Sequence, residues 1–197
     1  MQQGISSQLS RVAGWTWVRD LRQAPTSRLH ARRRRAAQDE LKRVKPRSVL
    51  FICHGNICRS PFAAAAFLRS CAPEIASGIK VTSAGFVGPE RCPPSNALIT
   101  ASRFGVDLSA HRSALISPEN LGAADLIVVM SPEQARAIRT RVTPSKFVLM
   151  LGDLDPRPVN RRTILDPWGQ PDAAFDESYD RIDRCVRELA RIISAAR

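Results

Sequence analysis

Cys53 and Arg59 are the two residues of this sequence whose types and spacing are best suited to phosphate chemistry. Arg59 follows Cys53 by six positions, within the run Cys-His-Gly-Asn-Ile-Cys-Arg-Ser-Pro at residues 53–61. A cysteine thiolate can attack the phosphorus of a bound phosphate monoester and form a phosphocysteine. An arginine has a planar, permanently charged guanidinium that can bind two phosphate oxygens at once, which a lysine cannot do. The pair therefore predicts nucleophilic displacement at phosphorus.

The residues around this pair predict a strand, a tight loop and the start of a helix. Residues 49–52 form a short continuous apolar run, which is typical of a strand buried on both faces of a parallel sheet. Ser60 and Pro61 precede the apolar residues 62–68, a pattern that predicts a helix with proline in its first turn. The N–H groups of the loop and the positive end of the helix dipole would form an anion site. We expect this site to favour the Cys53 thiolate and to lower its pKa below the usual value of about 8.5.

Gly55 and Asn56 are suited to such a loop because they belong to the residue types that best tolerate a positive φ. The alternative is that Cys53 is an unreactive core cysteine beside an ordinary turn. Glycine, asparagine, arginine and serine all stand in register with the cysteine, and this favours the catalytic interpretation.

Composition and length indicate one globular domain with an appendage. The chain has 197 residues, of which 44% are hydrophobic and 24% are charged. It contains no apolar run near the roughly 18 residues of a membrane span, and no apolar segment of a secretory signal. Five cysteines, two of them in the loop, argue against a disulfide scaffold and favour a reducing compartment. We therefore expect a cytoplasmic protein that uses no cofactor and no metal.

The positive charge is concentrated at the N-terminus. Residues 1–47 contain 12 Lys and Arg residues against three acidic residues, so they carry +9 of the chain's +12. This predicts a basic N-terminal extension, residues 1–47, before a domain at residues 48–197. Four apolar residues lie among its arginines: Trp15, Trp17, Val18 and Leu21. A partly disordered arm, contact with an anionic membrane surface or a partner, and contact with nucleic acid all remain open.

The rest of the chain alternates apolar runs with helix starts. Three further strands are predicted at residues 79–85, 126–130 and 146–151. Helices are predicted at residues 94–104, after Ser117, after Ser131, and along the apolar stripe from Phe175 to Ile193. This order predicts an α/β fold of three layers: a four-stranded parallel sheet, helices on both faces, and a phosphate-binding loop after the first strand.

The run at residues 53–61 resembles the signature loop of the low-molecular-weight protein tyrosine phosphatase family at every fixed position. Further stretches follow in the family's order: Ser83-Ala84-Gly85, residues 105–111, residues 124–130, and Asp166-Pro167-Trp168-Gly169. The resemblance covers about residues 48–195, and the short loop after Ser83 resembles bacterial members. It implies hydrolysis of phosphotyrosine in proteins, and bacterial members often act on tyrosine kinases of capsule or exopolysaccharide export.

The resemblance also assigns roles to individual residues. Cys53 is implied as nucleophile, Arg59 as phosphate clamp, Ser60 as the group that assists the departing thiolate, and Asp166 as general acid and then base. The residues implied to bind substrate are His54, Gly55, Asn56, Ile57, Cys58 and Trp168. Those implied to support the loop by hydrogen bonds are Asn56, Ser60, Ser83 and His111.

Three alternatives stay open from the sequence. Asp155 is followed by a proline just as Asp166 is, and so competes for the acid role, although the Trp-Gly pair after Asp166 favours the latter. An arsenate reductase of the same fold would need further cysteines to pass a disulfide along, and Cys71, Cys92 and Cys185 are available. A low-activity scaffold that acts through the basic extension is the third.

Overall fold

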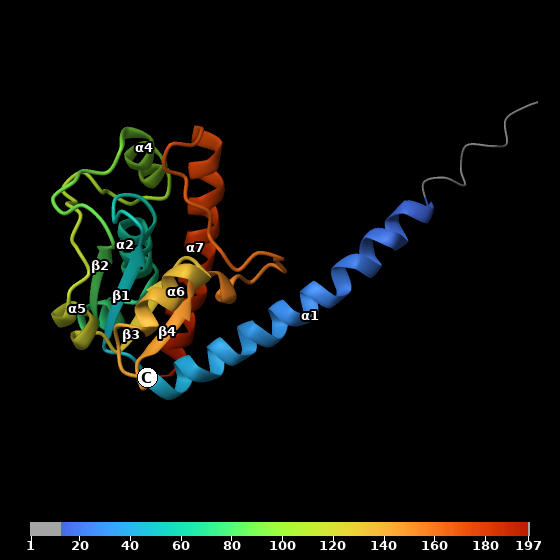
Figure 1. The fold of residues 1–197 in the computed structure, drawn as a ribbon, viewed down its shortest axis with the longest axis horizontal. Coiled ribbons are helices and arrows are strands. Elements are labelled where there is room, and N and C mark those ends of the chain that lie inside the picture. Colours follow the sequence, from blue (N-terminus) through green and yellow to red (C-terminus); the bar gives the residue numbers. More distant parts are fainter. Residues whose placement is uncertain (1–12, 197) are drawn as a thin grey trace, which may run out of the picture.

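The computed structural model describes the backbone of residues 13–196 and the side chains of residues 27–196. Within this range a parallel sheet of four strands stands at the centre (Figure 1), in the order β2-β1-β3-β4. The strands are β1 (Ser48–Cys53), β2 (Lys80–Gly85), β3 (Leu126–Val129) and β4 (Phe147–Met150). All neighbouring strands pair in parallel, so the predicted sheet is confirmed. Leu151 is not part of the fourth strand, because it begins the short 3-10 helix η1 (Leu151–Leu154).

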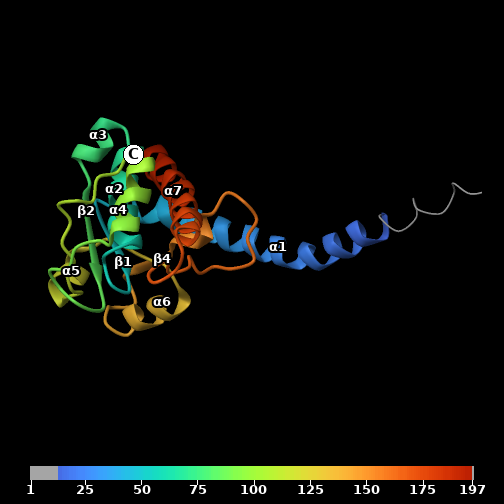
Figure 2. The ribbon, with the colours of Figure 1, turned by 90° about the horizontal axis from the view of Figure 1, so that it is seen from above.

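Helices cover both faces of the sheet, as predicted (Figures 1 and 2). One face carries α2 (Arg59–Ser70), α4 (Ser95–Arg103) and α7 (Asp172–Ala195), and the opposite face carries α5 (Pro118–Ala123) and α6 (Pro132–Arg139). The short α3 (Pro73–Ser77) leads from α2 to β2. Ser117 and Ser131 cap α5 and α6 through their side chains, and each is followed by proline. The predicted starts of these two helices are therefore confirmed.

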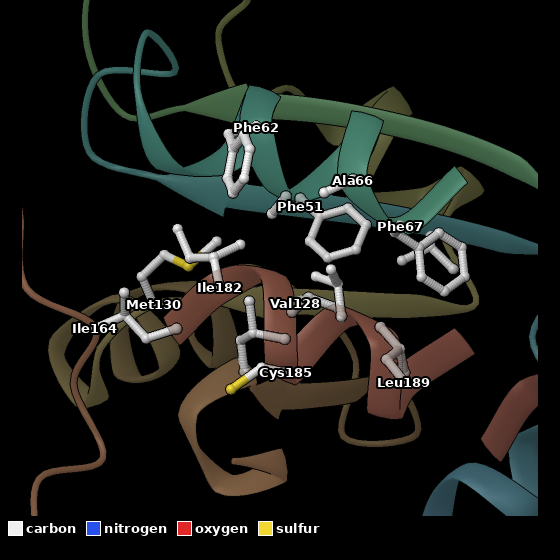
Figure 3. Close-up of a cluster of buried hydrophobic side chains, with 14 of the residues drawn as sticks. Phe51, Phe62, Ala66, Phe67, Val128, Met130, Ile164, Ile182, Cys185 and Leu189 are labelled. Carbon is white, nitrogen blue, oxygen red and sulfur yellow. The ribbon is translucent and has the colours of Figure 1, made fainter. Parts of the chain in front are cut away.

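Alternate residues of each strand supply two separate cores. Phe51 and Val128 face α2 and α7, where they join Phe62, Phe67 and Leu189 in a continuous apolar cluster (Figure 3). Their strand neighbours pack against α5 and α6 on the other face: Leu50, Ile52, Ile127 and Val129. Side chains of a strand point alternately to its two faces, so strands covered on both faces are apolar throughout. This explains why the sequence showed continuous apolar runs.

The N-terminal extension contains a long helix, α1 (Ala13–Val44), which leads away from the domain in both views (Figures 1 and 2). Its C-terminal part packs on the domain: Leu41 and Ala37 are buried in the core, while Arg34 and Gln38 donate hydrogen bonds to Glu188 of α7. Residues 27–44 thus belong to a helix whose C-terminal part is docked on the domain. The sequence of this helix has no broad apolar stripe. It is docked instead by the buried side chains of Ala37 and Leu41 and by the hydrogen bonds to Glu188.

The four apolar residues noted near the N-terminus lie outside the described side chains: Trp15, Trp17, Val18 and Leu21. Across the described part of the chain, every helix is either too short or too polar to cross a bilayer.

Three buried groups with raised pKa values lie on the face of the sheet that α2 and α7 cover. Burial raises the pKa of the Cys58 thiol to about 12. Burial likewise raises the pKa values of Tyr179 and Cys185. Such a group contributes stability below its unfolded pKa, and that contribution is lost as the pH rises toward the folded pKa. These groups should therefore make the fold sensitive to alkaline pH.

We expect the free energy of unfolding to fall as the pH rises above about 9, where thiols of the unfolded chain ionise. The Cys185→Ala variant should be less stable at neutral pH, but it should lose less stability between about pH 8 and about pH 10 because one group with a raised pKa has been removed. Urea unfolding at a series of pH values measures both slopes. Equal slopes in the two proteins would contradict this explanation.

Truncation of Leu41 tests the docking of α1. Leu41→Ala should lower the free energy of unfolding by about 2–4 kcal/mol, because it leaves a cavity between α1 and the core. Leu29→Ala is the matched control on the same helix, since Leu29 is 49% exposed and its truncation should change little. Urea unfolding of both variants measures the difference, and a loss of the same size in the two would show that α1 does not dock.

Candidate active site

The predicted phosphate loop lies between the end of β1 at Cys53 and the start of α2 at Arg59. It borders a cavity of about 220 Å³. Ten residues line this cavity: Cys53, His54, Gly55, Ile57, Cys58, Arg59, Val87, Arg91, Asp166 and Trp168. Residues from the loop, from the segment after β2 and from the segment before α7 thus meet at the carboxyl end of β1.

Asn56 holds the loop in shape. It is fully buried and has a φ of +52°. Its side-chain amide donates to the hydroxyl oxygens of Ser60 and Ser83, both at 2.9 Å, and its side-chain oxygen accepts from the N–H of Ala114 at 2.8 Å. Nε2 of His111 lies 2.7 Å from the carbonyl oxygen of Asn56. The structure thus brings together the four residues that the resemblance placed in one network.

The two residues expected to take a positive φ differ. Asn56 does so, whereas the expectation is wrong for Gly55, which is absent from the positive-φ residues of the described chain. A Cβ atom at Gly55 would lie 2.8 Å from Nη2 of Arg91, which donates to the Gly55 carbonyl, so a side chain there would displace the Arg91 guanidinium. A Cβ atom at Gly85 would likewise lie 2.8 Å from the backbone nitrogen of Asn56.

The sulfur of Cys53 lies among hydrogen-bonding groups at the buried end of the cavity. The N–H of Asn56 donates to it at 3.3 Å, and the hydroxyl oxygen of Ser60 lies 3.0 Å away. Donors directed at a thiolate stabilise its negative charge. Ser60 therefore lies where it can assist a departing thiolate.

Arg59 and Asp166, which both line the cavity, contact each other although they are 107 residues apart in the chain. Arg59 is buried. Its Nη1 donates to the carbonyl of Ile164 at 3.1 Å, and its Nη2 contacts the carboxylate of Asp166. Its Nε is buried and has no hydrogen-bond partner in the described part of the molecule. Buried donors are normally paired, so this unpartnered N–H is an exception within the described residues.

Asp166 and Trp168 form the outer part of the cavity. The Asp166 side chain is 43% exposed, and its Oδ1 accepts from the N–H of Trp168 at 3.3 Å. Trp168 is 62% exposed, so its ring presents a large apolar surface at the entrance. The competing carboxylate, Asp155, is fully buried and does not line the cavity.

Sequence reasoning missed three residues of the site. Arg91 and Val87 line the cavity, and Arg91 donates to the carbonyls of Gly55, Val87 and Gly88. No local motif marks either residue. Tyr179 donates its hydroxyl proton to the carbonyl of Cys58 at 3.1 Å, although the apolar stripe of α7 indicated core packing alone. A hydroxyl on a buried ring usually has a partner, which was the available clue.

Comparisons with known proteins bear on this geometry. The family model for low molecular weight phosphotyrosine protein phosphatases matches residues 48–197. The chain is 34% identical over 143 residues to EpsP of Ralstonia nicotianae, named a probable low molecular weight protein-tyrosine-phosphatase, with 71% of this chain and 91% of EpsP covered. It is 31% identical over 157 residues to Etp of Escherichia coli K12, a low molecular weight protein-tyrosine-phosphatase, with 78% and 99% covered.

A solved structure shows the same fold. The YwlE arginine phosphatase of Geobacillus stearothermophilus superposes with a TM-score of 0.66 at 26% identity, covering 76% of this chain and 94% of YwlE. The sequence resemblance, the observed loop and the family match agree over the same residues. The chain therefore belongs to the low molecular weight phosphotyrosine protein phosphatase family.

Proposed function

We propose that this protein is a protein tyrosine phosphatase that hydrolyses aryl phosphate monoesters through a phosphocysteine intermediate. One observation carries the proposal. The Cys53 sulfur, the buried Arg59 guanidinium and the Asp166 carboxylate surround a single cavity at the N-terminus of α2. We further propose that residues 48–197 are the phosphatase domain and residues 1–47 are an accessory extension.

Binding of the phosphate uses fixed donors. The loop N–H groups and the N-terminus of α2 attract the anion. Arg59 adds a permanent charge, and its unpartnered Nε is free to donate to a phosphate oxygen. These donors also stabilise the charge on the equatorial oxygens as the phosphoryl group transfers.

Transfer proceeds in two displacements. The Cys53 thiolate attacks phosphorus, a sulfur–phosphorus bond forms, and the bond to the phenolic oxygen breaks as protonated Asp166 gives its proton to that oxygen. The Asp166 carboxylate then accepts a proton from water, whose oxygen attacks phosphorus. The sulfur–phosphorus bond breaks, phosphate leaves, and the Ser60 hydroxyl stabilises the released thiolate, from which it lies 3.0 Å away.

The walls of the cavity favour an aromatic substrate. Ile57, Val87 and Trp168 provide apolar surface beside the phosphate site, and an exposed indole suits stacking on a phenyl ring. Phosphoarginine is the second candidate, because YwlE is an arginine phosphatase with this fold. We favour phosphotyrosine in a protein, such as a bacterial tyrosine kinase, since EpsP and Etp carry tyrosine phosphatase names at higher identity.

The remaining alternatives have weaker support. Cys71, Cys92 and Cys185 do not line the cavity. In an arsenate reductase one of them would have to move to Cys53 to form a disulfide. Cys185 is fully buried in α7. A scaffold that acts through contact of the basic extension with nucleic acid or an anionic membrane would not require the arrangement of Cys53, Arg59 and Asp166.

Cys53→Ser and Arg59→Ala should each lower turnover of a phosphotyrosine peptide by more than about a thousandfold, because they remove the nucleophile and the phosphate clamp. Cys92→Ser and Arg103→Ala are matched controls at exposed positions outside the cavity and should retain the wild-type rate. Phosphate release from phosphotyrosine and phosphoarginine peptides of the same sequence measures the preference. A higher kcat/KM for phosphoarginine would assign the protein to the second candidate, and no turnover of either peptide would refute the phosphatase proposal.

Asp166→Asn should slow phenyl phosphate far more than p-nitrophenyl phosphate, because p-nitrophenolate leaves without a proton. We expect a loss of about 100-fold or more for the first substrate and a much smaller loss for the second. Asp172→Asn is the control, since Asp172 is exposed at the start of α7. Single-turnover release of phenol and nitrophenol measures the effect, and equal losses would show that Asp166 is not the acid.

A further inference from the structure

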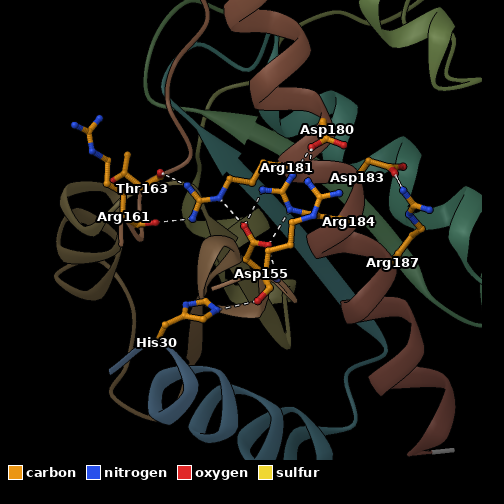
Figure 4. A network of polar contacts seen from close by, with 10 residues as sticks. His30, Asp155, Arg161, Thr163, Asp180, Arg181, Asp183, Arg184 and Arg187 are labelled. Carbon is orange, nitrogen blue, oxygen red and sulfur yellow. Dashed lines mark hydrogen bonds and ion pairs between the residues drawn. The ribbon is translucent and has the colours of Figure 1, made fainter. Parts of the chain in front are cut away.

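Asp155 is a buried carboxylate that the proposed reaction does not use. It follows η1 and is fully buried. Arg181 donates to its Oδ2 at 3.0 Å, and Arg184 donates to Oδ1 at 2.8 Å and to Oδ2 at 3.0 Å (Figure 4). The N–H of Arg157 donates to Oδ1 at 3.1 Å. We name Asp155, Arg181 and Arg184 the Asp155 cluster.

The cluster keeps Asp155 ionised. Burial alone would raise the pKa of this carboxyl, but the hydrogen bonds from Arg184 and the Arg157 N–H, with the charges of Arg184 and Arg181, outweigh it and lower the pKa. A buried carboxylate with several donors is satisfied, whereas one that loses a partner destabilises the fold. Asp155 is therefore a fixed negative point between η1 and α7.

Arg181 connects this fixed point to the segment that carries the proposed acid. Its Nη1 donates to the carbonyl of Thr163 at 2.8 Å, and its Nη2 donates to the carbonyl of Arg161 at 2.5 Å. These carbonyls precede Asp166 by three and five residues. One planar guanidinium thus bonds a carboxylate and two carbonyls at once, a geometry that the single ammonium group of lysine does not reproduce.

The remaining residues before Asp166 are also held. The N–H of Ile164 donates to the carbonyl of Met130 at 2.9 Å, and the Ser178 hydroxyl donates to the carbonyl of Leu165 at 3.2 Å. The Asp166 side chain itself is 43% exposed and lines the cavity. Since residues 155–171 contain no helix or strand, these side-chain bonds take over the positioning that a regular element would provide.

The docked part of α1 closes the cluster from the other side. His30 is buried, and its Nε2 lies 2.9 Å from the backbone carbonyl of Asp155. A carbonyl oxygen only accepts, so the ring N–H donates. The N-terminal extension therefore contacts Asp155, which also binds Arg181. Arg181 in turn binds the backbone that precedes Asp166.

We propose that Arg181 is a positioning residue for Asp166. Through Asp155 it fixes the backbone at residues 161–163, and so sets where the Asp166 carboxyl lies relative to the leaving oxygen; His30 of α1 supports Asp155 from behind. This inference rests on the proposed phosphatase reaction. A small displacement of a catalytic group is costly because proton transfer requires hydrogen-bond reach.

Arg181→Lys tests the proposal, because it keeps a positive charge beside Asp155 and removes the simultaneous bonds to the two carbonyls. We expect kcat/KM for phenyl phosphate to fall about tenfold or more and that for p-nitrophenyl phosphate to fall less than about twofold. Arg187→Lys is the matched control. Arg187 lies on the same helix, is 63% exposed, and pairs with Asp183 of α7 rather than with a carbonyl of residues 161–163. Arg187→Lys should leave kcat/KM unchanged for both substrates.

A double-variant cycle separates positioning from general damage. In the Asp166→Asn background, Arg181→Lys should cause no further loss on phenyl phosphate, because the group that it positions is already gone. Equal losses on both substrates, or losses that multiply with those of Asp166→Asn, would overturn the proposal. Wild-type protein that turns over neither substrate would instead refute the proposed function. If Arg181→Lys does not fold, judged by thermal unfolding, Asp155→Asn replaces it, with the same expected selectivity and the same overturning result.

Discussion

The left-handed backbone of buried Asn56 is the constraint on which the active site depends. A non-glycine residue with positive φ costs about 1–2 kcal/mol. This cost is offset by hydrogen bonds that Asn56 makes with three parts of the chain: Ser60 at the start of α2, Ser83 of β2, and the segment that contains His111 and Ala114. The same network carries Ser60 to the sulfur of Cys53. The conformation of the loop therefore depends on hydrogen bonds from β2, from the start of α2 and from residues 111–114.

Helix α7 organises the rest of the molecule because it is apolar on one side and paired in charge on the other. Its apolar side fills the core against α2. On its polar side, three buried acids form ion pairs with arginines. Asp183 and Glu188 belong to α7 itself, whereas Asp155 follows η1 and pairs with Arg181 of α7. Asp183 ties α7 to Arg69 of α2, and Glu188 ties it to Arg34 of α1. Several arginines of this chain, whose net charge is +12, thus form ion pairs with buried acids. Loss of such an arginine would leave a buried carboxylate without its partner.

Much of the fold was predictable, and the reasons are local. The continuous apolar runs indicated buried parallel strands, and the serine-proline pairs at Ser117 and Ser131 marked two helix starts that the structure confirms. The docking of residues 27–44 was not predictable, because Ala37 and Leu41 form no broad stripe and their partners lie on α7 and the sheet. The positive φ expected of Gly55 is also absent; what the sequence did not indicate is that its carbonyl accepts a hydrogen bond from Arg91, 36 residues away.

The sequence by itself indicated the family, the strand–loop–helix unit and Cys53 as the candidate nucleophile, because Cys53 and Arg59 lie within one unit whose geometry is set by neighbouring residues. It left two Asp-Pro pairs as rivals for the acid. The Trp-Gly pair favoured Asp166, but only the tertiary structure shows where the two carboxylates lie: Asp166 meets Arg59 across 107 residues, while Asp155 is enclosed by Arg181, Arg184 and, across 125 residues, His30. Contacts over such separations depend on how whole layers pack, and no local pattern records them.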